Sequence, residues 1–157
     1  MKIWQGAILT ALLVLGLAVG AGANTAVFTD PSGDVRGPGG ADYDVVRVSH
    51  GHRGGVLVHT IRTRGQHTDD SPAPEMGSGR TPDFYVTAGG VFRIGTGSGL
   101  RKVGNADLKD TGPRTFELLF RPRAINSPRK YEWRVIMGAV SGTVDRAPRG
   151  YVTHVLR

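Results

Sequence analysis

The pattern of apolar and polar positions is one of short runs separated by turn-forming residues. The 24 glycines and 9 prolines recur every few residues, which is typical of turns and loops. The runs between them are rich in Val, Ile, Phe, Tyr and Thr, the residues enriched in β-strands. We expect strands at residues 44–49, 56–63, 83–87, 91–95, 100–103, 115–120, 131–140 and 150–156, with a long polar loop at 65–81. Beyond residue 23, only 124–129 suits a turn of helix.

The segment 56–63 shows the two-residue alternation of a strand most clearly. One face carries Val56, Val58 and Thr60, and the other carries Leu57, His59 and Ile61. Since both faces are largely apolar, we expect this strand at the centre of a sheet. Many short strands with uneven connections predict an all-β fold. The prediction is a single-domain antiparallel β-sandwich, jelly-roll-like in architecture.

The first 23 residues have the organisation of a secretory signal peptide. Lys2 supplies a positive charge, residues 7–19 an apolar segment, and Ala21-Gly22-Ala23 a cleavage site. A retained membrane anchor is the alternative, but the apolar segment is shorter than the roughly 20 residues that a spanning helix needs. We therefore expect a signal peptide at 1–23, a β-sandwich domain at 24–157, and no transmembrane segment after cleavage. The protein would be secreted, and it could associate with the cell wall.

Amino-acid composition limits which cellular compartment and which classes of partner are expected. The chain has no cysteine, so neither disulfides nor a lipidated cysteine can stabilise or anchor an exported domain. Its formal net charge is +7, which on an exported protein favours anionic envelope polymers or lipid head groups. The basic residues are not gathered into one tract, so we expect no nucleic-acid partner. A charged surface that only confers solubility is the alternative.

Carboxylates are concentrated in one Gly- and Pro-rich stretch, at Asp30, Asp34, Asp42 and Asp44. Ca²⁺ takes six to eight oxygen ligands on a backbone that can bend around it, and glycines at 33, 37, 39 and 40 provide that freedom. The spacing differs from that of an EF-hand. The alternatives are turns capped by aspartate side chains and ion pairs with Arg36 or Arg47.

Two short motifs resemble a known group of domains. Thr29-Asp30-Pro31-Ser32-Gly33-Asp34, followed by Asp44-Val45-Val46-Arg47-Val48, is similar to the start of DOMON-like β-sandwiches, including the family 9 carbohydrate-binding modules. Tyr131-Glu132-Trp133 and the segment 145–150 resemble the end of exported actinobacterial β-sandwich proteins. The resemblance implies a β-sandwich and, as in some members, Ca²⁺ and sugar binding. It also suggests that Asp145 completes a calcium site with the four aspartates of the loop.

The aromatic residues depart from a sugar-binding pattern. Trp133 is the single tryptophan after residue 23, and it lies in a strongly apolar strand. A platform of two exposed aromatic rings is therefore not expected. This departure weakens the prediction of a carbohydrate ligand and leaves the prediction of the fold unchanged.

Histidines offer a second candidate chemistry. We expect His50 and His52 in a hairpin connection at 50–55, where two imidazoles suit Zn²⁺ or Cu²⁺ but are too few for a structural site. His59 lies on an apolar face, which favours a buried structural role. His154 lies on the same face of its strand as Val152 and Leu156, and His67 lies in the polar loop.

No catalytic motif stands out. Gly97-Ser98-Gly99 lacks the spacing of a hydrolase nucleophile, and Glu117 and Glu132 have basic neighbours and are expected to face solvent. We expect an exported non-catalytic binding module for a carbohydrate or cell-envelope polymer, with calcium as the candidate cofactor. One alternative is an exported hydrolase that uses carboxylates of the 30–44 loop. Another is a structural or protein-interaction domain.

Overall fold

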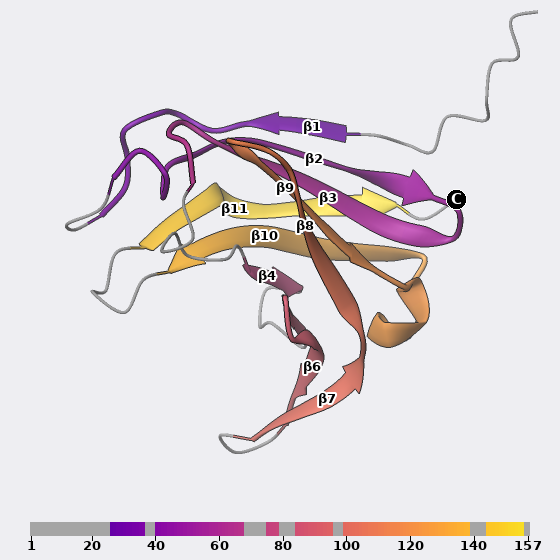
Figure 1. The fold of residues 1–157 in the computed structure, drawn as a ribbon. Helices are drawn as coiled ribbons and strands as arrows, with labels where there is room; N and C mark the ends of the chain where they lie inside the picture. The colour runs from indigo at the N-terminus through magenta and orange to yellow at the C-terminus, as the bar shows by residue number, and fades with distance from the viewer. Residues whose placement is uncertain are drawn as a thin grey trace, which may run out of the picture.

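The structure, a computed structural model, describes residues 26–36, 40–67, 75–78, 84–95, 99–138 and 144–155. Within these ranges the chain forms two antiparallel β-sheets and one short 3-10 helix (Figure 1). The predicted all-β, antiparallel sandwich is confirmed. The predicted signal peptide at 1–23 lies outside the described residues, as do 37–39 of the acidic loop and 96–98 around Ser98. None of the described helical residues forms a segment long and apolar enough to cross a membrane.

The first sheet has five strands in the order β1-β2-β3-β9-β8. They span Ala26–Thr29 (β1), Val45–Arg53 (β2), Val56–Thr63 (β3), Thr115–Phe120 (β9) and Ala106–Gly112 (β8). Strand β3 lies between β2 and β9, which confirms its predicted central place. The second sheet has six strands in the order β11-β10-β4-β5-β6-β7. They span Val144–Val155 (β11), Lys130–Gly138 (β10), Glu75–Ser78 (β4), Phe84–Thr87 (β5), Gly90–Ile94 (β6) and Leu100–Gly104 (β7).

The turn between β2 and β3 is tighter than the sequence suggested. Gly54 and Gly55 have φ angles of 58° and 75°, the two positive values that a two-residue hairpin turn requires. Strand β2 therefore continues to Arg53, and the predicted connection at 50–55 is wrong for its first four residues. His50 and His52 consequently belong to a strand and point into the sandwich with Val48, because alternate residues share a face.

Four further stretches of strand were missed, each for a local reason. Strands β1 and β4 have four residues each, and β4 lies within the predicted polar loop. Strand β8 is mostly exposed and polar, so it lacks an apolar signal. Strand β11 begins at Val144 although Pro148 interrupts its sequence. Because β11 is the edge strand of its sheet, a proline without an N–H is tolerated there.

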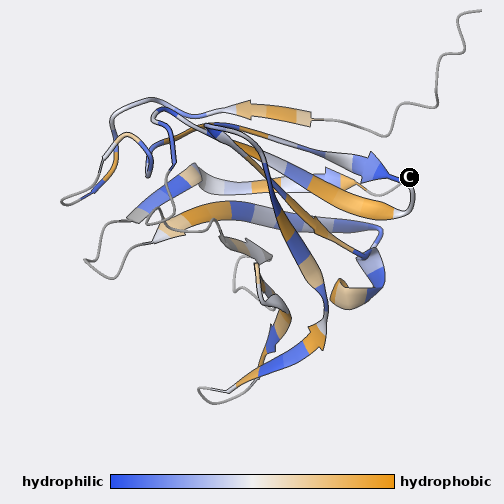
Figure 2. Ribbon diagram, viewed as in Figure 1, coloured by the Kyte–Doolittle hydropathy of each residue, from blue (hydrophilic) through white to orange (hydrophobic). Residues whose placement is uncertain are grey.

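One hydrophobic core lies between the sheets and contains residues of both. Figure 2 shows the alternation of hydrophobic and hydrophilic residues along strands such as β3 and β10. On β10 the inward positions are Tyr131, Trp133, Val135 and Met137, all buried. The inward positions of β3 are Leu57, His59 and Ile61, which the sequence groups on one face, and each is fully buried. The single helix, η1 at Pro122–Ile125, follows β9 and buries Ala124 and Ile125.

Candidate functional site

Three aspartates from distant parts of the chain converge at one edge of the sandwich. Asp30 follows β1, Asp34 lies four residues later, and Asp145 is the second residue of β11. One carboxylate oxygen of each lies within 4.8 Å of the other two. Asp30 and Asp145 are only 4% and 2% exposed. Carboxylates grouped in this way and shielded from solvent can hold a hard cation.

Backbone geometry places the N-terminal pair of aspartates. The N–H of Asp30 donates to the carbonyl of Val46 over 3.0 Å, which continues the pairing of β1 with β2. The chain then turns at Gly33, whose φ of 86° suits glycine. The N–H of Gly33 donates to Asp44 Oδ2 over 2.7 Å. The turn is thus tied to the residue that precedes β2, with Asp34 beside it.

Asp145 is held by hydrogen bonds to its carboxylate. Its Oδ2 accepts from the N–H of Val45 over 2.6 Å, and its Oδ1 accepts from the N–H of Arg146 over 2.7 Å. Burial nevertheless raises the pKa of Asp145, and the negative charges of Asp34 and Asp44 add to this rise, although the two hydrogen bonds oppose it. The carboxylates therefore repel one another, and a bound cation would relieve that repulsion.

Asp44 has a different environment. It is fully buried, and its Oδ2 accepts from Arg64 Nε over 2.5 Å as well as from Gly33. The backbone repeats this link, since the N–H of Arg64 donates to the carbonyl of Asp44 over 2.8 Å. Asp44 thus forms an ion pair, the alternative considered for these acids, but with Arg64 instead of Arg36 or Arg47.

The loop before β2 packs closely against the end of β3. A β-carbon added to Gly65 would lie 2.6 Å from the backbone of Ala41, so only glycine permits this approach. The N–H of Gly65 donates to the carbonyl of Ala41 over 2.6 Å. Asp42, the remaining candidate ligand, is half-buried and does not belong to the group of three. Of the five predicted ligands, the structure brings together Asp30, Asp34 and Asp145.

A cluster of buried histidines occupies the other half of the interior. His50 on β2, His59 on β3 and His154 on β11 are 3%, 0% and 1% exposed. The ring centroids of His50 and His154 lie 4.0 Å apart, and those of His50 and His59 lie 6.0 Å apart. Tyr131 Oη and His59 Nε2 form a hydrogen bond of 3.1 Å. Among the described residues, the three aspartates are the single group of three or more with the spacing of metal ligands.

Burial holds these histidines in the neutral form. It lowers the pKa of both His50 and His154 from 6.5 to about 4, and their histidine neighbours contribute to this effect. It lowers the pKa of His59 well below its usual value, and His50, His154 and His52 reinforce the shift. Trp133 packs edge-on against His50 and His59, with ring centroids 5.0 Å away in both cases. The cluster is therefore part of the core, as predicted for His59.

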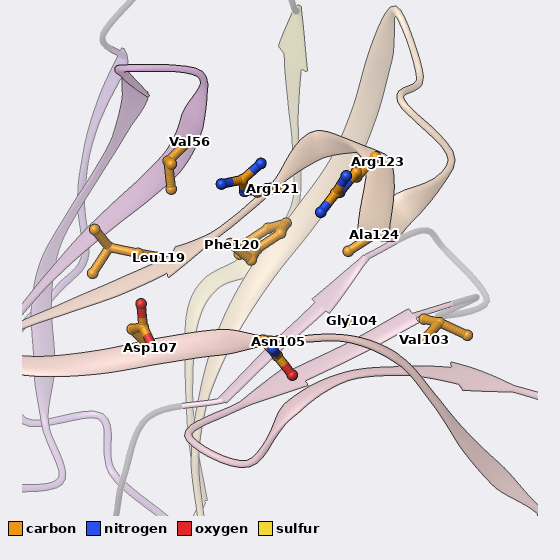
Figure 3. Close-up of a pocket in the computed structure, with 10 residues that line it drawn as sticks. All are labelled: Val56, Val103, Gly104, Asn105, Asp107, Leu119, Phe120, Arg121, Arg123 and Ala124. Carbon is orange, nitrogen blue, oxygen red and sulfur yellow. The ribbon is translucent and has the colours of Figure 1, made fainter.

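A pocket of about 690 Å³ lies at the opposite end of the fold (Figure 3). It forms where the chain passes from β7 in one sheet to β8 in the other, beside η1. The Arg121 and Arg123 side chains lie on one side of the Phe120 ring in Figure 3, and Asn105 and Asp107 on the other. The pocket volume falls in the usual range of small-molecule sites.

Close packing of Gly104 against η1 shapes this pocket. A β-carbon on Gly104 would lie 2.6 Å from the β-carbon of Ala124, which is closer than real contacts allow. The residue at 104 must therefore be glycine for the helix to approach the β7–β8 corner. Since Arg121 is the N-cap residue of this helix and Arg123 lies within it, the close approach also positions their side chains.

Comparison with known proteins adds no relative. No protein-family model, no curated protein and no solved structure matches this chain. The residues themselves are therefore the basis for a functional proposal.

The sequence indicated the aspartates but neither the histidine cluster nor the pocket. The histidine cluster depends on β2 extending through His52. The glycines at 51, 54 and 55 made this stretch look like a loop instead of a strand. For the pocket, the available signal was Arg121-Pro122-Arg123 directly after the apolar run 115–120. Pro122 lacks the N–H that a central strand needs, so the strand ends before it. The arginines on either side of this proline are exposed.

Proposed function

We propose that the protein is an exported, non-catalytic binding module that holds Ca²⁺ between Asp30, Asp34 and Asp145. We further propose that its ligand is a carbohydrate or an anionic polymer of the cell envelope. The observation that carries this proposal is the convergence of the three carboxylates within 4.8 Å. Such an ion would connect the loop after β1 to β11 and so join the two sheets.

The chemistry of the cluster suits calcium better than a transition metal. All three side chains offer oxygen, which hard cations prefer, whereas Zn²⁺ and Cu²⁺ favour imidazole or thiolate. Ca²⁺ would need further oxygens, which backbone carbonyls and water commonly supply. The pKa of Asp145 is raised mainly by burial and further by the charges of Asp34 and Asp44, and a divalent ion would offset the repulsion from those two carboxylates.

Charge and resemblance support the choice of ligand class. The chain carries a formal net charge of +7, which attracts anionic polymers and increases their rate of encounter. Its opening motif resembles that of DOMON-like carbohydrate-binding domains. The only tryptophan of the described residues, Trp133, is fully buried, so sugar recognition would depend on polar and charged groups instead of a tryptophan platform.

The calcium proposal is tested by thermal melting of the mature chain after EDTA treatment, with and without added CaCl₂. We expect Ca²⁺ to raise Tm, by an amount that grows with the ratio of its concentration to Kd. Asp34→Asn should abolish the rise, whereas Asp107→Asn, a change to an exposed carboxylate on β8, should preserve it. A Tm that is the same in EDTA and in millimolar Ca²⁺ would refute the calcium site.

The ligand proposal is tested by cosedimentation with purified cell-wall material, before and after removal of its anionic polymers. We expect binding that weakens with added salt, as charge attraction requires, and that falls when the anionic polymers are removed. Equal failure to bind both preparations would overturn the ligand class while leaving the calcium result unaffected.

A further inference from the structure

The pocket beside η1 combines three kinds of surface. Its floor is apolar and consists of Val56 and Leu119 on the outer face of the first sheet, whereas the neighbouring Phe120 turns into the core. Two guanidinium groups, those of Arg121 and Arg123, lie along one side. A carboxylate and a carboxamide, from Asp107 and Asn105, lie along the other. Each surface suits a different part of a ligand.

The two arginine side chains are available for binding. Neither makes an ion pair or a side-chain hydrogen bond with another described residue, and both are exposed. This contrasts with Arg53 and Arg64, which pair with Glu117 and Asp44. Guanidinium groups bind carboxylates through two parallel hydrogen bonds. Two arginines against one aspartate leave the pocket with a net positive charge.

The opposite side suits hydroxyl groups. Asp107 lies opposite Leu119 in the β8–β9 register, so the two side chains share the outer face of the first sheet. Asp107 and Asn105 are exposed and together can accept and donate hydrogen bonds. Leu119 and Val56 supply apolar surface between them and the arginines. A ring that has a C–H face and hydroxyl edges would fit such a surface.

We infer that this pocket binds an acidic sugar unit, a hydroxylated ring that carries a carboxylate. The carboxylate pairs with Arg121 and Arg123, the hydroxyl groups bond to Asp107 and Asn105, and the ring packs on the apolar floor. This inference rests on the proposed function, because it assigns the place and the chemical class of the envelope ligand. It is independent of the calcium site, which lies between β1 and β11.

The probe is trigalacturonic acid, measured by isothermal titration calorimetry on the mature chain with Ca²⁺ present. A neutral galactose trimer tests the need for the carboxylate, and a glycerol phosphate oligomer tests the need for a sugar ring. We expect trigalacturonate to bind, and the two other oligomers to bind at least about tenfold more weakly, because each lacks part of the charge-assisted or ring contact.

Variants locate the site. Arg121→Gln and Arg123→Gln should each weaken trigalacturonate binding by about tenfold. Arg129→Gln is the matched control: it removes an exposed arginine near η1 that does not line the pocket, and it should leave affinity within about twofold. All three proteins should melt at the wild-type temperature, because the altered side chains are exposed.

Each contrary result has a distinct meaning. Equal binding of the neutral trimer, or of the glycerol phosphate oligomer, overturns the assignment of an acidic sugar. Equal loss in Arg129→Gln and Arg121→Gln overturns the assignment of the pocket. If trigalacturonate does not bind but cell-wall material still sediments with the protein, this inference fails and the proposed function stands. If neither binds, this inference and the proposed ligand class both fail, and the calcium result is unaffected.

Discussion

The N–H of Val45 on β2 donates a hydrogen bond to Asp145 Oδ2 on β11 over 2.6 Å, and this bond links the two sheets. Val45 begins β2, and Asp145 is the second residue of β11. The same carboxylate accepts from the N–H of Arg146 and belongs to the cluster with Asp30 and Asp34. One side chain therefore supports the joint between the sheets and the candidate cation site.

Asp145→Asn should reduce stability and remove the response to calcium. Both carboxylate oxygens accept backbone hydrogen bonds, but an amide has a single oxygen, so one buried N–H would face an NH₂ group. We expect a loss of about 1–3 kcal/mol in the free energy of unfolding, measured by urea denaturation in EDTA. Adding Ca²⁺ should stabilise the wild type and leave the variant unchanged. A variant that gains as much from Ca²⁺ as the wild type would show that Asp145 is not a ligand.

Asp44 and Arg64 should be energetically coupled. Asp44→Ala removes the acceptor of Gly33 and Arg64, whose donors can both turn to water, and should cost about 1–2 kcal/mol. Arg64→Ala should also destabilise the protein, because it leaves the fully buried carboxylate of Asp44 without its cation, although water screens the 52% exposed Arg64 side chain. The double variant should be less destabilised than the sum of the two, when measured as a double-mutant cycle. Additive losses would show that the two residues do not interact in solution.

The alternation of apolar residues was enough to predict the sandwich and the centre of the first sheet. It succeeded for 56–63 because the inward positions Leu57, His59 and Ile61 are fully buried and the outward Val58 is only 8% exposed. It failed for β8, whose exposed positions carry Asp107, Lys109 and Asp110, because its pairing with β9 comes from the backbone and leaves no mark on side-chain polarity.

The candidate sites also differ in whether they depend on local sequence or on the pairing of distant strands. The aspartates could be found because they are close in sequence, and the C-terminal motif suggested Asp145. The pairing of Asp44 with Arg64 could not be predicted, since it depends on the close approach of Gly65 to Ala41. The histidine cluster requires the register that sets His50 opposite His59 and Tyr131 opposite His154. Register depends on turn geometry and on the cross-strand partners.

Acid should destabilise the protein through the histidine cluster. In the folded protein the pKa of His50 and of His154 is about 4, against 6.5 in an unfolded chain. As the pH falls below about 6.5, the unfolded chain takes up protons that the folded chain does not, so stability is lost between pH 6.5 and 4. Each such histidine contributes a slope of up to about 1.4 kcal/mol per pH unit and a total of about 3 kcal/mol.

Two variants test this origin by urea denaturation between pH 7.5 and 4.5. His154→Leu should reduce the slope of unfolding free energy against pH by the share of one histidine. Tyr131→Phe removes the hydroxyl that bonds to His59 but keeps the three buried imidazoles, so it should lower stability with little change in slope. His52 and Tyr131 are the other titratable groups with rings packed against the cluster. An unchanged slope in His154→Leu would assign the acid sensitivity to other groups.

Gly104→Ala should disturb η1 and the pocket that it borders. The new methyl group would lie 2.6 Å from the β-carbon of Ala124, so η1 must move or the backbone must shift, at a cost of about 1–3 kcal/mol. The control Gly112→Ala adds a methyl group that meets nothing within 4 Å, and it should be close to neutral. The second change Ala124→Gly removes the atom in conflict and should restore most of the lost stability. If Gly104→Ala melts with the wild type, η1 does not pack on the β7–β8 corner as the structure places it.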